Sequence, residues 1–123
     1  VSIMRSKYGT YPEYHTSLDD FSLVTARGLE GGLAALQATV DASEKNYTYK
    51  NVFQCEPQLS KHGLYPSMSS KNSGLTVRNM MNLLTYTDGK TDLLAVSEKI
   101  NITIDEAATI AERMVECGVL KRT

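Results

Sequence analysis

Residues 75–123 carry three successive runs of apolar residues at helical spacing. The first run ends at a turn formed by Asp88 and Gly89, and the second begins at Thr91 or Asp92. The apolar residues of the three runs are Val77, Met80, Met81 and Leu84, then Leu93, Leu94, Val96 and Ile100, and last Ala107, Ile110, Ala111, Met114 and Val115. Three short helices with a tight turn between the last two predict a helix-turn-helix.

The third of these helices has a marked start and a marked end. Thr103 and Glu106 have the spacing of a capping box, in which each side chain accepts a hydrogen bond from the other residue's backbone amide. Gly118 predicts a left-handed stop, and a short strand begins at residues 119–121. With this strand, residues 75–123 are predicted to form a winged helix-turn-helix domain.

Residues 1–60 show a different organisation, in which a polar loop precedes a long helix and a strand. The helix is predicted over residues 25–46, and the strand over residues 47–55. One apolar face of the helix consists of Leu29, Leu33, Leu36 and Val40. Residues 61–74 are rich in Ser and Gly and predict a linker, so the expected fold class is α+β in two parts.

The charge of the chain argues against nucleic-acid binding. The 13 basic and 14 acidic residues give a net charge of −1, so the chain lacks an overall basic field. The predicted third helix, which reads DNA in many helix-turn-helix proteins, has Arg113 against four acidic residues, and one minus four gives −3. The acidic residues are Asp105, Glu106, Glu112 and Glu116. Phosphates would repel this helix, so we expect a packing, dimerisation or protein-docking role.

The two cysteines and the hydropathy pattern point to a reducing, cytoplasmic location. Cys55 and Cys117 lie far apart and lack Cys-x-x-Cys spacing, which argues against a disulfide framework and against a cysteine zinc site. No apolar run reaches the length of a membrane span, and no signal-peptide pattern opens the sequence. We therefore expect no membrane partner.

The two histidines are weak evidence of function when each is taken by itself. His15 lies in the polar loop before the long helix, and a lone histidine is more often structural or exposed than a metal ligand. His62 lies in the predicted linker, where we expect an exposed side chain.

The order of four segments, however, resembles one family. These segments are Arg5 to Asp20, Cys55 to Leu59, Gly63 to Pro66 and Arg78 to Leu84. They resemble the C-terminal part of bacterial aminopeptidase-like proteins of the M28 zinc-peptidase type. The similarity is greatest to a polysaccharide-biosynthesis subgroup with a C-terminal winged helix. The resemblance covers essentially the whole chain, and it implies that residues 1–60 are the last piece of an α/β aminopeptidase-like domain.

The resemblance also implies roles for three residues of the Tyr14-to-Asp19 motif. In this family a late histidine is the last ligand of a two-zinc site, and His15 has that place; imidazole is a good zinc ligand. Asp19 matches a His-x-x-x-Asp pattern and would orient the ligand from the second shell, with a turn or cap residue as the alternative. Tyr14 would stabilise the reaction intermediate as a catalytic residue, or else pack in the core.

The chemistry that the resemblance implies is zinc-assisted hydrolysis of a peptide-like substrate. A catalytic zinc normally has three protein ligands, and residues 1–123 match none of the family's other ligands. We therefore expect the chain to be inactive by itself and to partner with the remainder of the domain, or with further copies of itself as a homo-oligomer. The alternative is that the chain is a winged-helix DNA-binding or regulatory module with an N-terminal extension.

Overall fold

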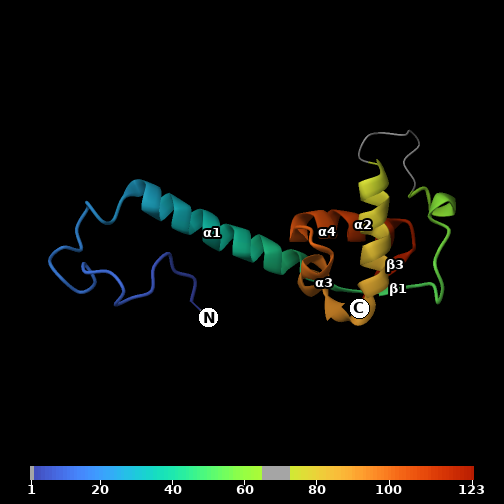
Figure 1. Ribbon diagram of the computed structural model, residues 1–123, viewed down its shortest axis with the longest axis horizontal. Coiled ribbons are helices and arrows are strands. Elements are labelled where there is room, and N and C mark those ends of the chain that lie inside the picture. The colour runs from blue at the N-terminus through green and yellow to red at the C-terminus, as the bar shows by residue number, and fades with distance from the viewer. Residues whose placement is uncertain (1, 65–72) are drawn as a thin grey trace. The chain divides into compact units, whose positions relative to one another are not determined.

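The computed structural model describes residues 2–64 and 73–123 (Figure 1). Its helices and strands, in chain order, are α1 (Ala26–Lys45), β1 (Thr48–Asn51), a 3-10 helix (Leu59–His62), α2 (Ser73–Tyr86), β2 (Asp88–Asp92), α3 (Leu93–Ile100), α4 (Ile104–Glu116) and β3 (Leu120–Arg122). The predicted α+β class is confirmed. The contacts divide the chain into two units, residues 1–41 and 42–123.

The first unit consists of a loop of successive turns followed by most of α1. The Thr25 hydroxyl accepts a hydrogen bond from the Gly28 amide at 3.1 Å, which satisfies one of the free amides at the start of the helix. The long helix predicted over residues 25–46 is therefore confirmed as α1. Its predicted apolar face is exposed, with Leu29 and Leu33 each 66% exposed, and α1 has no buried residue.

The second unit contains an antiparallel sheet in the order β2-β1-β3. The central strand, β1, comes from the segment predicted as a strand before the linker. Thr48 pairs with Asp92 of β2, and Tyr49 pairs with Arg122 of β3. The strand that was expected to end the first part thus completes the sheet of the second, because both of its edges find partners there.

The core of the second unit lies between this sheet and helices α2, α3 and α4, which contact one another. Its fully buried side chains include Tyr49, Met80, Leu83, Leu93, Val96, Met114 and Val119. Leu59 and Leu64 are also buried, at 2% and 0% exposure, so the 3-10 helix and the residues beside it pack on the domain. Of the predicted linker 61–74, residues 65–72 lie outside the described residues.

The helix ends follow the predicted signals with one correction. Asp92 caps α3 by accepting from the Ala95 amide at 2.8 Å. Thr103 accepts from the Glu106 amide at 3.2 Å, and Gly118 has a left-handed φ of 70°. The reciprocal half of the predicted capping box was wrong. The Glu106 carboxylate instead accepts a hydrogen bond from the Asn79 side chain at 3.0 Å and so joins α4 to α2.

Within the described ranges, none of the helices is both long enough and apolar enough to cross a membrane.

Candidate functional site

His15 lies at the centre of a tight turn in the loop before α1. The amide of Thr16 donates to the carbonyl of Glu13 at 3.1 Å, and the Thr16 hydroxyl donates to the same carbonyl at 2.9 Å. His15 itself has a φ of 58°, a left-handed conformation that costs a residue other than glycine roughly 1–2 kcal/mol. Such conformations concentrate at functional sites, where the surrounding structure maintains them. The turn presents the imidazole as an exposed side chain.

Tyr14 lies among the aromatic rings of the same loop. Its ring centre is 4.2 Å from that of His15, in an edge-to-face arrangement, and 5.8 Å from that of Tyr11. Aromatic pairs favour this geometry. Tyr14 is 38% exposed, so its phenol ring packs on its neighbours in the loop and remains accessible to solvent.

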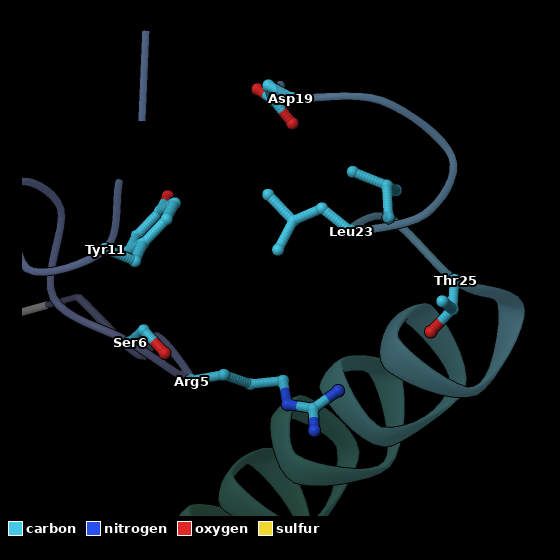
Figure 2. Close-up of a pocket in the computed structure, with 7 residues that line it drawn as sticks. Arg5, Ser6, Tyr11, Asp19, Leu23 and Thr25 are labelled. Atoms are coloured by element: carbon cyan, nitrogen blue, oxygen red, sulfur yellow. The ribbon is translucent and has the colours of Figure 1, made fainter. Parts of the chain in front are cut away.

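Asp19 lies in a different part of the loop, at a cavity of about 650 Å³ (Figure 2). The residues that line this cavity are Arg5, Ser6, Tyr11, Asp19, Leu23, Val24 and Thr25. Among the described residues His15 is not part of this lining, so the loop places Asp19 and His15 at separate features. Tyr11 and Tyr14 lie between these two features. Tyr11 lines the cavity and its ring packs against that of Tyr14, which in turn packs against the ring of His15.

Of the residues that line this cavity, only Asp19 was singled out by sequence reasoning, and Arg5 is the charged residue among those that were missed. Arg5 lies inside the segment that resembles the peptidase family, but the described chain from Arg5 to Asp19 forms turns without a helix or strand, so no periodic pattern links the two residues. The available signal was their opposite charge on either side of a loop rich in turn formers.

The residues of this chain do not form a complete zinc centre. Over residues 2–64 and 73–123, no three His, Cys, Asp or Glu side chains come together where they could hold a metal ion. Zinc sites with catalytic activity normally have three protein ligands. His15 can supply at most one of them, so its role, and those of Tyr14 and Asp19, stay predictions.

In the second unit, the surface of α4 is acidic and partly engaged in ion pairs. Asp105 pairs with Lys45 at 2.5 Å, and Glu112 pairs with Arg122 at 2.5 Å. The guanidinium of Arg113 donates to the carbonyl of Gly63 at 3.4 Å. The basic groups that approach α4 are thus directed to carboxylates and carbonyls of this domain.

His62 is half-buried, which differs from the exposed position expected for a linker residue. Its Nδ1 lies 3.1 Å from the Cys117 carbonyl, to which it donates, and its ring packs edge-on against Phe53 at 5.3 Å. His62 therefore fastens the segment after β1 to the end of α4, which is a structural role.

Comparison with known families agrees with this architecture. A family model described as winged helix-turn-helix matches residues 47–122, a range that includes β1. The chain belongs to the winged helix-turn-helix family. A second model, described as a domain of unknown function, matches residues 1–46. The two matches meet at the junction of α1 and β1, close to the division that the contacts show.

One curated relative, from Clostridium acetobutylicum, is named "Putative polysaccharide biosynthesis protein with aminopeptidase-like domain". It is 30% identical over 122 residues, which cover 98% of this chain and 28% of the relative. A crystal structure from Clostridium acetobutylicum, described as a "putative peptidase", matches with a TM-score of 0.78 and 29% identity. This match covers 98% of the chain and 26% of the solved one. The winged helix-turn-helix chain thus spans less than a third of the length of either, and the predicted resemblance to aminopeptidase-like proteins is confirmed.

Proposed function

We propose that this winged helix-turn-helix chain contributes to a zinc-dependent aminopeptidase-like hydrolase that cleaves a peptide-like substrate. The observation that carries the proposal is the match of 98% of the chain, at a TM-score of 0.78, to a structure described as a "putative peptidase". The name of the curated relative supports it. A cytoplasmic location fits the two free cysteines, Cys55 and Cys117.

His15 is the zinc ligand that this chain supplies under the proposal. Its exposed imidazole and its left-handed backbone are consistent with a side chain held outward for a partner. The remaining ligands would come from residues outside this chain, that is, from the remainder of the aminopeptidase-like domain. By itself the chain would then lack hydrolase activity, because one histidine cannot hold a catalytic zinc.

Zinc content tests this proposal. In the polypeptide as its natural gene encodes it, purified with zinc and dialysed, we expect His15→Ala to lose at least one bound zinc ion per chain. His62→Ala is the matched control, because His62 bonds to the Cys117 carbonyl and should leave the zinc content unchanged. Inductively coupled plasma mass spectrometry measures the number of zinc ions per chain. Equal zinc in the wild type and in His15→Ala would show that His15 is not a ligand.

We propose that the winged-helix unit makes a protein contact and does not read DNA. The support is the acidic surface of α4, where Asp105, Glu106 and Glu116 are exposed and Glu112 is half-buried. A helix of this charge would meet phosphates on both sides of a major groove. Membership in the winged helix-turn-helix family favours DNA binding as the second candidate.

A further inference from the structure

Two lysines lie directly opposite each other on the outer face of the sheet in the second unit. Lys50 of β1 pairs with Lys121 of β3 in the antiparallel register, and both are exposed. Their neighbours Tyr49 and Leu120 are buried on the core side, and side chains alternate between the two faces of a strand. Like charges at directly opposite positions destabilise a sheet. An anion between the two ammonium groups would offset this repulsion.

The charges of the two lysines are not neutralised by the described part of the chain. Over residues 2–64 and 73–123, neither Lys50 nor Lys121 forms an ion pair. Asp88 of β2 lies opposite Lys50 on the other side of β1. Its carboxylate, however, accepts hydrogen bonds from two backbone amides of its own turn, each at 2.8 Å. Both ammonium groups therefore retain their charge for a ligand.

Gly89 gives the side chain of Lys50 a surface to pack on. A Cβ atom built on Gly89 would lie 3.2 Å from Lys50 Cδ and 3.3 Å from its Cβ and Cγ, so the aliphatic stem lies against the backbone of the turn. Gly89 also has a φ of 82°, which favours glycine. This contact restricts the positions of the ammonium group, so the side chain loses less conformational entropy when it binds an anion.

The two lysines line a cavity of about 500 Å³, which lies within the ordinary range for small-ligand sites. The lining also includes Asn51, Phe53 and Gln54. Phe53 is 37% exposed, and its ring packs against another aromatic ring at 5.3 Å, which orients an accessible apolar surface. The side-chain amides add hydrogen-bond donors and acceptors. An apolar ring surface beside polar groups suits a ligand that has a ring with hydroxyl groups.

We propose that this cavity binds the phosphate monoester of a small hydroxylated molecule, with the phosphate between Lys50 and Lys121. A phosphate monoester has a charge near −2 at neutral pH, which matches two ammonium groups, whereas a single carboxylate matches one. Lysine binds phosphate as a point charge. The body of the molecule lies against Phe53, with its hydroxyl groups toward the polar lining residues. The proposal goes beyond the proposed function, because the cavity belongs to the second unit and the loop before α1 to the first.

Calorimetry on the natural gene product, with two esters and their dephosphorylated counterparts, tests the proposal. We expect AMP or glucose 6-phosphate to bind at least about tenfold more tightly than adenosine or glucose, respectively. The ester that binds more tightly identifies the body as a nucleoside or a sugar. Inorganic phosphate should bind at least about tenfold more weakly than that ester, because it has no body to contact Phe53. Binding of neither ester at about 10 mM, or equal binding of each ester and its counterpart, would overturn the proposal.

Lysine variants assign the phosphate to its residues. Lys50→Gln and Lys121→Gln should each weaken binding of the tighter ester about tenfold and leave its dephosphorylated counterpart within about twofold. Lys90→Gln is the matched control, because Lys90 is an exposed lysine of β2 outside the cavity lining. Ester binding that is unchanged in both cavity variants would overturn the proposal, as it would if a bound zinc ion held the phosphate.

Thermal melts give a second, independent measurement. Because the two lysines repel each other, either glutamine variant should melt at the wild-type temperature or higher when no ligand is present. The ester should raise the melting temperature of the wild type but not that of the Lys50→Gln and Lys121→Gln double variant. A double variant that melts at a lower temperature without ligand would show that the pair stabilises the fold, which contradicts the proposal.

Duplex DNA is a competing source of phosphate at this face of the sheet. We expect that a duplex of about 20 base pairs does not displace the bound ester, because two lysines neutralise only two phosphates. Displacement at about 50 mM salt would identify the lysines as a DNA contact and would overturn the proposal.

Discussion

Tyr49 is the residue that joins the sheet of the second unit to α4. Its side chain is 1% exposed, and its hydroxyl donates to Glu112 Oε1 at 2.5 Å. Glu112 in turn pairs with Arg122 of β3, so the central strand, an edge strand and a helix meet at one carboxylate. The hydrogen bonds from Arg122 and Tyr49 lower the pKa of Glu112 and keep this carboxylate charged.

Removing the Tyr49 hydroxyl should destabilise the second unit. We expect Tyr49→Phe to lower the free energy of unfolding by about 2 kcal/mol, because the hydrogen bond is made to a charged group. Urea denaturation followed by circular dichroism measures the change. Tyr47→Phe is the control, since the Tyr47 ring is 43% exposed and keeps its contact with the Arg122 guanidinium without a hydroxyl. A loss of similar size in the control would contradict the expectation.

The Tyr49 phenol should also titrate late. Burial raises the pKa of Tyr49 to about 12 from its ordinary value near 10, and the neighbouring Glu112 carboxylate adds to the effect. Because the pKa is raised in the folded state, the stabilisation is complete below pH 10 and is lost as the pH rises through about 12. Absorbance at 295 nm should show a tyrosine ionisation step at about pH 12. This late step should be missing in Tyr49→Phe.

At the scale of single elements, α4 depends on its first turn. Thr103→Ala removes the side-chain acceptor for the Glu106 amide, and we expect it to cost about 1 kcal/mol of stability. Thr109→Ala is the matched control in the same helix, because the Thr109 hydroxyl bonds only to the carbonyl of Asp105 one turn earlier. Alanine should be neutral or slightly stabilising there. Thermal melts of both variants give the comparison.

The charge of α4 leads to a prediction about DNA. We expect no binding of a fluorescent 20-base-pair duplex at 50 mM salt, where non-specific electrostatic binding would be favoured. Replacing the exposed residues Asp105 and Glu116 with lysine would change the helix charge from −3 to +1 by adding two units at each position, and it leaves Glu112 with its partners. If acidic repulsion is the cause, this double variant should gain salt-sensitive binding. Saturable binding by the wild type would favour the DNA-reading candidate.

The four α-helices of the described chain were predictable from the sequence, because each has its own apolar period and its own end signals. The partners of β1 were not, since four residues of strand sequence carry no information on which edges they meet. The same applies to Glu106, whose partner Asn79 lies 27 residues away. Turns bring Arg5 and Asp19 to one cavity, and turns have no sequence period. The charges of the two residues were therefore known from the sequence, but their proximity could not be predicted.

At the scale of the whole molecule, the buried core belongs to one unit only. The buried hydrophobic residues of the described chain begin at Tyr49, and residues 2–41 contribute none of them. Stability rests mainly on apolar burial, so the two units should differ strongly in local stability. The exposed apolar face of α1, formed by Leu29, Leu33, Leu36 and Val40, belongs to the first unit, for which we expect the lower local stability.

Hydrogen exchange should show this difference in the 123-residue chain by itself. We expect the amides of α2, α3, α4 and β1 to exchange slowly, near the rate of global unfolding. The amides of residues 2–41 should exchange within seconds to minutes, because their opening exposes little apolar surface. Mass spectrometry of peptic peptides resolves the two groups. Protection of α1 equal to that of α4 would contradict this expectation.

The junction of α1 and β1 has a mechanical consequence. The last residue of α1 is Lys45 and the first of β1 is Thr48, so only residues 46 and 47 separate the helix from the central strand. A pulling force applied along α1 would therefore act on the strand that β2 and β3 both hold. Because β1 has a neighbour on each side, its hydrogen bonds to β2 and to β3 must break together before the strand can leave the sheet. The winged helix-turn-helix unit should accordingly resist tension from α1 better than tension from β3, which has a single neighbour.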